Sequence, residues 1–123
     1  MARRVGSSLI SLPLSLAFLM LCLISGGTKN LVQGQKTWCV AKPSSDEATL
    51  LANINFACSQ VDCGVLQKGS PCFYPDSLVS HASVAMNLYY QSRGRKFWNC
   101  YFKNSGLIVM TDPSFGSCIY GCN

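Results

Sequence analysis

The fold is decided by the stretch 76-DSLVSHASVAMNLYYQSRG-94, which has the pattern of a single helix. Asp76 is a typical helix N-cap and Gly94 a typical helix end, so the sequence predicts a helix over residues 77–93. At about 100° per residue, the middle of its apolar arc is formed by Leu78, Ala82, Ala85 and Tyr89. The polar side holds Ser80, Ser83, Asn87 and Gln91, with Val84 at its edge. This wheel predicts that Tyr89 lies in the core and that Tyr90 lies at the margin.

The segments around this helix predict a second helix and a small sheet. Pro43 to Glu47 reads as a helix start with Ser45 or Asp46 as N-cap, and an apolar face follows, so we expect a first helix over 46–59. Residues 37–40 read as a strand, and 62–75 as a loop rich in Gly and Pro. Residues 99–102 and 107–111 are predicted to form a hairpin. The expected class is α+β: a small disulfide-stapled domain with two main helices and a small antiparallel sheet.

The N-terminus has the three parts of a secretory signal peptide. A basic start at 1–4 precedes an apolar run at 9–24 and the small residues 25–27. The alternative is a membrane anchor, but the apolar run is shorter than the ~20 residues a span needs and contains Pro13. We therefore expect a signal peptide at 1–27, a short polar lead at 28–36 and a domain at 37–123.

The net charge and the C-terminal sequence bear on whether the protein binds nucleic acid or carries a lipid anchor. The whole chain carries a formal charge of +5, and the signal peptide takes Arg3 and Arg4 with it. The remaining excess is too weak to indicate nucleic acid binding. Only 93-RGRK-96 is a basic cluster, typical of a solvated turn or of a contact with an acidic polymer or lipid. The absence of an apolar tail leads us to expect no lipid anchor.

The expected mature chain contains seven cysteines, and secretion makes a disulfide framework the default. They are Cys39, Cys58, Cys63, Cys72, Cys100, Cys118 and Cys122. Seven is odd, so at least one thiol is left over, and spacing alone cannot select the pairing. A zinc site is the rival interpretation, but the spacing is scattered and His81 is the only histidine. No metal or other cofactor is expected.

The sequence gives little indication of catalysis. Glycoside hydrolysis needs two carboxylates that flank the scissile bond. The acidic residues of the domain are better explained as helix N-terminal or turn residues. His81 could in principle activate a neighbouring serine, but it has no evident carboxylate partner, so a packed, hydrogen-bonded histidine is the better interpretation. We expect no enzyme activity.

Aromatic residues are more suggestive of a ligand. Flat rings with a polar edge suit stacking on sugar rings, while the alternative is that they fill a core short of aliphatic residues. Core positions are favoured for Trp38, Tyr89 and Phe102. Surface positions are plausible for three others, which lie beside loop signals or at the exposed arc: Tyr74, Tyr90 and Trp98.

A series of short blocks resembles the plant family 43 carbohydrate-binding module, also called the X-eight domain. The blocks are Trp38-Cys39-Val40-Ala41-Lys42-Pro43, Ala57-Cys58, Asp62-Cys63, Pro71-Cys72-Phe73, His81-Ala82-Ser83, Met86-Asn87, Tyr89-Tyr90-Gln91, Gly94-Arg95, Asn99-Cys100, Phe102 and Asp112-Pro113-Ser114-x-Gly116-Ser117-Cys118. They extend over about 37–118. The family usually has Tyr where this chain has Val84, a departure that bears on glucan affinity if the position is exposed.

The resemblance implies two helices, a small sheet and binding of β-1,3-glucan such as callose without hydrolysis. It also implies the pairs Cys39–Cys100, Cys58–Cys63 and Cys72–Cys118, which leaves Cys122 unpaired or intermolecular. The chain is similar to the small stand-alone secreted members, which include a pollen allergen and plasmodesmal callose-binding proteins.

We therefore expect a secreted, non-catalytic β-1,3-glucan-binding protein of the plant cell wall or apoplast. Tyr74, Tyr90 and Trp98 are predicted to stack on sugar rings, and Asn87 and Gln91 to bind hydroxyls. The alternative is a cationic secreted signalling or defence protein that acts on membranes or a receptor. A Cys122-linked dimer that doubles binding valency is a further possibility.

Overall fold

The computed structural model describes residues 36–121, and that part of the chain forms an α+β fold. Its elements in chain order are β2 (Trp38–Ala41), α3 (Glu47–Gln60), the 3-10 helix η2 (Gly64–Leu66), α4 (Leu78–Ser92), the 3-10 helix η3 (Phe97–Cys100) and β3 (Gly106–Val109). The predicted fold class, with two main helices and a small antiparallel sheet, is confirmed. The expected signal peptide at 1–27, the polar lead up to residue 35 and Cys122 lie outside the described residues.

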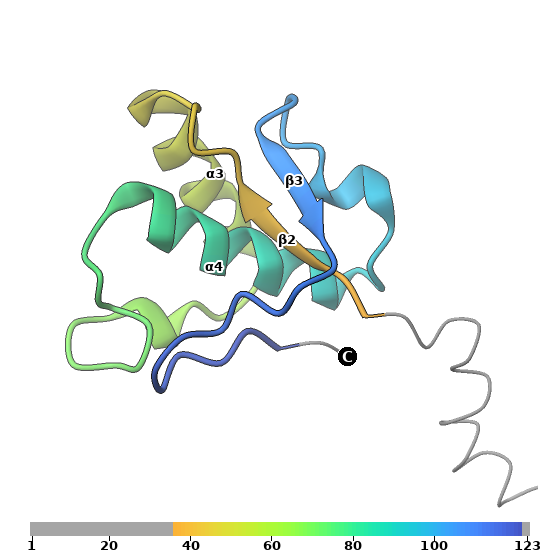
Figure 1. The fold of residues 1–123 in the computed structure, drawn as a ribbon. Coiled ribbons are helices and arrows are strands. Elements are labelled where there is room, and N and C mark those ends of the chain that lie inside the picture. The colour runs from red at the N-terminus through yellow and green to blue at the C-terminus, as the bar shows by residue number, and fades with distance from the viewer. Residues whose placement is uncertain (1–35, 122–123) are drawn as a thin grey trace, which may run out of the picture. The chain divides into compact units, whose positions relative to one another are not determined.

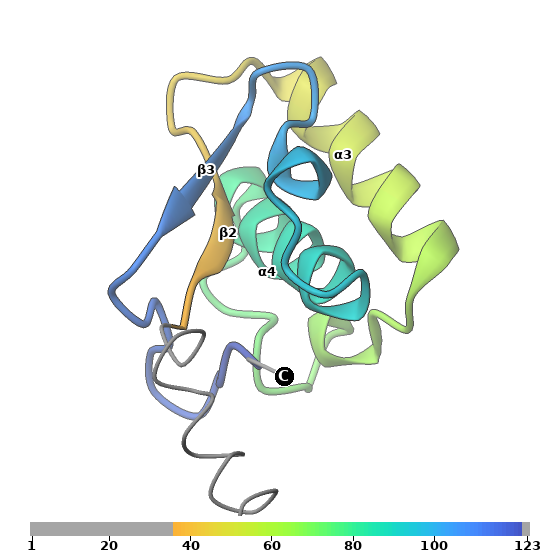
Figure 2. The same cartoon turned by 90° about the vertical axis from the view of Figure 1, so that its right-hand side faces the viewer.

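Helix α4 lies between the sheet and α3, as two perpendicular views show (Figure 1, Figure 2). The two helices run side by side in the same direction with a constant offset of 33 residues. Three pairs show this register: Asn53 with Met86, Phe56 with Tyr89, and Gln60 with Arg93. The long connection at 61–77 returns the chain to the start of α4.

The helix ends follow the sequence signals with one correction. Asp46 caps α3, and its side chain accepts the Thr49 N–H at 2.8 Å. The N-cap of α4 is Ser77, whose hydroxyl accepts the Ser80 N–H, and not the expected Asp76. Serine caps helices as well as aspartate does, so composition does not distinguish two adjacent candidates. Gly94 follows α4 with a φ of +82°, a conformation that glycine adopts easily.

The polar side of α4 faces the outer edge of β2. Ser83 accepts the Ala41 N–H at 2.9 Å, and Asn87 accepts the Cys39 N–H at 3.1 Å. Gln91 donates to the Thr37 carbonyl at 2.9 Å. Four residues of an α-helix rise about 6 Å and two residues of a strand about 6.6 Å. Polar side chains spaced four residues apart on α4 therefore lie opposite every second residue of the strand. The helix thus supplies hydrogen bonds that a third strand would otherwise supply.

The other edge of β2 pairs with β3. The strands are antiparallel, with Trp38 opposite Val109 and Ala41 opposite Gly106. The expected hairpin between 99–102 and 107–111 is therefore wrong: the first segment contributes to η3 and to a turn. The turn residues Phe102, Lys103 and Asn104 have φ values of +41°, +51° and +68°, which no strand can adopt. The sheet joins segments that are far apart in the sequence.

Three disulfides join these elements, with the pairing that the resemblance implied. The bonds are Cys39–Cys100, Cys58–Cys63 and Cys72–Cys118. The buried apolar residues form two clusters. One lies around the Cys39–Cys100 bond and includes Leu50, Met86 and Tyr90, and the other lies around Cys72–Cys118 and includes Trp38, Val84 and Tyr120.

Candidate functional site

Three of the five residues expected to bind sugar lie in the interior. Tyr90 is 2% exposed, Asn87 1% and Gln91 5%. The expected exposure of these side chains was wrong, because the wheel treated α4 as a helix with one solvent face. The middle of α4 is enclosed by α3, by β2 and by the segment that ends at Gly121, whose carbonyl accepts from Asn87.

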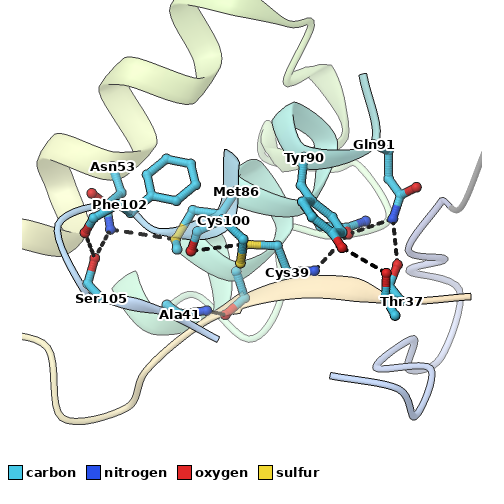
Figure 3. Close-up of a disulfide and its surroundings, with 12 residues drawn as sticks. Thr37, Cys39, Ala41, Asn53, Met86, Tyr90, Gln91, Cys100, Phe102 and Ser105 are labelled. Atoms are coloured by element: carbon cyan, nitrogen blue, oxygen red, sulfur yellow. Dashed lines mark hydrogen bonds between the residues drawn. A yellow bond between two sulfur atoms is a disulfide. The ribbon is translucent and has the colours of Figure 1, made fainter. Parts of the chain in front are cut away.

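These three side chains hold β2 in place, as Figure 3 shows for Tyr90 and Gln91. The Tyr90 hydroxyl lies 2.8 Å from the Thr37 hydroxyl, and the Gln91 amide also bonds the Thr37 carbonyl. Buried polar groups need such partners, because an unpaired one costs about 1–3 kcal/mol. Their role in the structure is to satisfy an edge strand.

Two further expectations about α4 change for the same reason. Val84 is 4% exposed and packs in the second buried cluster, so it does not lie at an exposed edge. Tyr89, expected in the core, is half-buried and lines a surface groove. Trp38 is buried as expected.

The groove lies between α3 and the segment from η3 to the following turn. Its volume is about 630 Å³, and its lining residues are Asp46, Ala48, Thr49, Ala52, Asn53, Phe56, Tyr89, Trp98, Asn99, Phe102 and Lys103. Along α3, the residues Thr49, Ala52, Asn53 and Phe56 follow the spacing of one helix face. Ala48 and Ala52 contribute small side chains to the lining.

The floor of the groove is aromatic. The rings of Phe56, Tyr89 and Phe102 meet edge to face, with centroids 5.0 Å, 5.9 Å and 6.2 Å apart. This is the favoured geometry for aromatic packing, so the three rings brace one another. The guanidinium of Arg93 lies 4.8 Å from the centroid of the Tyr89 ring. Trp98 stands at the rim with 58% of its surface exposed.

The rim of the groove is polar. Hydrogen bonds from the Thr49 hydroxyl and N–H lower the pKa of the Asp46 carboxyl. Asp46 therefore stays an ionised acceptor under mildly acidic conditions. Asn99 and the exposed Lys103 add further polar groups. The Asn53 side chain is buried, and its amide donates to the Ser105 hydroxyl at 2.8 Å.

The turn that forms one wall is held in an unusual backbone conformation. Three successive non-glycine residues, 102–104, have positive φ. The turn is fixed from outside by Lys42, whose Nζ donates to Asn104 at 2.9 Å and whose N–H donates to the Ser105 carbonyl. Such backbone outliers gather at functional sites, where the surrounding structure holds them. A preformed wall of this kind favours a ligand-binding surface.

Tyr74 does not lie with Trp98. It lines a second hollow, formed with Phe115 and neighbouring small residues, that has no lining residue in common with the groove. Tyr74 precedes α4 and Trp98 follows it, and the 15 residues of α4 span about 22 Å. Figure 1 shows the loop before α4 and η3 at opposite ends of the helix.

Of the groove's lining residues, only Trp98 was predicted to bind sugar, and the aromatic residues that sequence reasoning missed are Phe56, Tyr89 and Phe102. Phe56 lies on α3 outside the apolar face that the pattern selected, and the other two were expected in the core. The available signal was the excess of aromatic residues near the ends of the two helices. It could not show that three of them meet at one surface, because that depends on the register between α3 and α4.

The described carboxylates are mostly engaged in local structure. Asp46 caps α3, Asp62 accepts the Gly64 N–H at 2.7 Å, and Asp112 accepts the N–H and hydroxyl of Ser114. His81 is half-buried and donates through Nε2 to the Phe73 carbonyl at 2.6 Å. The same nitrogen lies 3.9 Å from Oδ1 of Asp76, so the expectation that His81 lacks a carboxylate partner is wrong. Among residues 36–121, no group of three or more His, Cys, Asp or Glu is placed to hold a metal ion. Within the same range, no helix has the length and apolar character that crossing a membrane requires.

Comparison with known proteins gives one family and a set of plant relatives. A family model described as the X8 domain matches residues 37–107. The major pollen allergen Ole e 10 of Olea europaea is 47% identical over 90 residues, covering 72% of this chain and 73% of the allergen. A glucan endo-1,3-beta-D-glucosidase of Olea europaea is 48% identical over 83 residues, or 67% of this chain. A glucan endo-1,3-beta-glucosidase of Triticum aestivum is 47% identical over 87 residues, or 71% of this chain. The matched part is 18% and 19% of these two glucosidases.

Proposed function

Because the chain belongs to the X8 domain family, we propose that it is a non-catalytic carbohydrate-binding protein that holds β-1,3-glucan in the groove between α3 and η3. The observation that carries the proposal is the groove itself, with braced aromatic rings below, exposed Trp98 at the rim and polar groups beside them. Sugar rings have apolar faces and polar edges, so they fit a surface of this mixed character.

The choice of ligand rests on the relatives. Two of them carry the name of an enzyme that acts on 1,3-β-glucan, and the part they share with this chain is under a fifth of their length. A shared module that is separate from most of the enzyme is suited to holding the substrate. Callose is our proposed glucan, and the plant cell wall or apoplast our proposed location, reached through the signal peptide expected at 1–27.

The absence of catalysis is proposed for a structural reason. A glycosidase needs two carboxylates placed on either side of one bond. Among the described residues, Asp46 is the one carboxylate that lines the groove, and it also caps α3. Asp46 is suited to accept a sugar hydroxyl.

Affinity electrophoresis tests the proposal. Wild-type protein is expected to be retarded in gels that contain β-1,3-glucan, and not in gels with β-1,4-glucan or without polymer. Trp98→Ala should weaken binding about tenfold, which corresponds to about 1.4 kcal/mol. The matched control is Tyr101→Ala, because Tyr101 is similarly exposed and is not among the described residues that line the groove.

Equal retardation of Trp98→Ala and wild type would refute the groove as the site. No retardation of wild type would refute glucan binding and favour the cationic alternative, for which anionic lipid vesicles are the probe. The structure gives that alternative little support, since Arg93 is engaged with Tyr89 and Gln60.

A Cys122-linked dimer remains a proposal, since Cys122 lies outside the described residues. Non-reducing gels of wild type and Cys122→Ser test it directly. A dimer band in the wild type that disappears in the variant supports the bridge.

A further inference from the structure

The second hollow lies between two loops, and we call it the trough. Its lining residues are Gly69, Ser70, Pro71, Tyr74, Phe115, Gly116 and Ser117. It has a volume of about 440 Å³, and Tyr74 and Phe115 stand on its sides. A neighbouring hollow of about 330 Å³ shares Ser70 and Pro71 with it and leads on to Asp62. The two loops, 69–74 and 115–118, are joined by the Cys72–Cys118 disulfide, and residues of both line the hollow (Figure 1, Figure 2).

The trough is preformed. Phe73 packs edge to face against Tyr74, with the ring centroids 4.8 Å apart, and the Phe73 carbonyl accepts from His81. The loop is also closed on itself, because the Cys72 N–H donates to Val65 and the Phe73 N–H to Ser70. Tyr74 is nevertheless 66% exposed. A large ring held by packing on one side and open to solvent on the other costs little entropy when it binds a ligand.

The chemistry of the lining selects a neutral, hydroxyl-rich ligand. Within residues 36–121, no charged side chain lines the hollow around Tyr74, which offers two aromatic rings, a proline and the hydroxyls of Ser70 and Ser117. A hypothetical Cβ at Gly69 or Gly116 would meet nothing within 4 Å, so the backbone there is open to approach. An anionic ligand would find no cation in this lining. The carboxylate of Asp62 at the far end adds an acceptor for hydroxyl groups.

We propose that this trough is a second glucan-binding site, so that one domain holds two β-1,3-glucan chains at once and cross-links them. The proposal rests on the proposed function for the identity of the ligand. The groove and the trough share no lining residue and lie near opposite ends of α4. One chain in each site connects two polymers without any contact between protein copies, and the two sites together raise the retention on insoluble glucan.

A bridging assay tests the inference in a Cys122→Ser background, which removes a disulfide-linked dimer as a source of bivalency. Beads that carry immobilised β-1,3-glucan are loaded with protein, and the capture of a labelled soluble β-1,3-glucan is measured. The Cys122→Ser parent bridges, while Tyr74→Ala and Trp98→Ala in this background each still bind the beads but lose bridging by at least about tenfold. Calorimetric titration with a β-1,3-glucan oligosaccharide gives two sites for the parent and one for each variant.

Matched variants separate the possible outcomes. Tyr101→Ala bridges as the parent does. Ser117→Arg, a second change in the trough that leaves Tyr74 intact, reproduces the loss seen with Tyr74→Ala. Full bridging by both trough variants overturns the inference and leaves the groove standing. If Tyr74→Ala loses bridging while Trp98→Ala bridges as the parent does, the groove is not a glucan-binding site. That result also refutes the inference that one domain carries this pair of sites. Absence of any bead binding by the parent refutes the proposed function and the second site with it.

Discussion

Asn87 shows at the scale of one residue how a polar side chain becomes part of the framework. Its carbonyl oxygen accepts from the Cys39 N–H and from Gln91, and its amide donates to the Gly121 carbonyl, all at 3.1 Å. It therefore joins β2, α4 and the C-terminal segment. The same side chain on an exposed helix face would be a plausible sugar ligand, so only its surroundings decide its role.

Asn87→Ala is expected to destabilise the domain by about 2–3 kcal/mol, because the buried Cys39 N–H and the partly buried Gly121 carbonyl lose their partner. Urea unfolding with the disulfides intact measures this, with the exposed Gln67→Ala as a control expected within about 0.5 kcal/mol of wild type. Glucan binding by the folded variant should be unchanged. Unaltered stability combined with lost binding would restore Asn87 as a direct sugar contact.

Tyr120 gives a residue-level prediction about alkaline pH. Its ring is 7% exposed, and burial raises the pKa of its hydroxyl to about 12. An unfolded tyrosine ionises near pH 10, so above that pH the unfolded state loses its proton while the folded state keeps it. The stabilisation is complete below about pH 10 and is lost as the pH rises toward 12.

The free energy of unfolding of the wild type should therefore fall by about 1–2 kcal/mol more than that of Tyr120→Phe between about pH 9 and 11.5. Urea titrations at the two pH values measure it, and ultraviolet titration should show a late-ionising tyrosine in the wild type that Tyr120→Phe lacks. The same pH dependence in both proteins would contradict the assignment.

At the scale of elements, the sheet depends on the close approach of β3 to η3. A Cβ placed on Gly106 would lie 1.8 Å from the carbonyl oxygen of Cys100, far inside any allowed contact. The strand can therefore pair with β2 only if residue 106 has no side chain. The polar stripe of α4 sets the other edge of β2, so this strand is fixed on both sides.

Gly106→Ala is expected to prevent normal folding, at a cost of more than about 4 kcal/mol, because the clash is with backbone and not with a movable side chain. Gly121→Ala is the control, since a Cβ there would meet nothing within 4 Å. The yield of correctly oxidised protein and its thermal midpoint measure the effect. A Gly106→Ala protein as stable as the control would show that η3 and β3 are farther apart than described.

At the scale of the whole molecule, the disulfides divide into two long-range bonds and one local bond. Cys39–Cys100 and Cys72–Cys118 are separated by 61 and 46 residues in the sequence, and Cys58–Cys63 by 5. Each long-range bond passes through one of the two buried clusters. A small domain with a divided core depends on such cross-links.

Loss of a long-range bond should cost about 4 kcal/mol through loop entropy, and loss of Cys58–Cys63 about 2 kcal/mol. The comparison is between the paired variants Cys72→Ala with Cys118→Ala and Cys58→Ala with Cys63→Ala, by thermal unfolding under non-reducing conditions. A larger loss from the local pair would show that strain or packing, and not chain entropy, governs stability here.

The two helices, the short strand at β2 and the oxidised cysteine framework could be predicted from the sequence alone, because caps, apolar periodicity and cysteine content are local signals. The resemblance of its motifs supplied the pairing of the cysteines. Of the five expected sugar contacts, Tyr74 and Trp98 were predicted from the sequence pattern to lie at the surface, and both do.

Which faces are buried and which strands pair depends on how the elements pack together. A helix wheel scores hydrophobicity, and it therefore assigned Ser83, Asn87 and Gln91 to solvent. They are buried because the edge of β2 carries N–H and carbonyl groups that need partners, and α4 lies within reach. The groove exists because Phe56, Tyr89 and Phe102 meet through the register of α3 on α4. Contacts between segments so far apart depend on how the chain packs, and no local pattern encodes them.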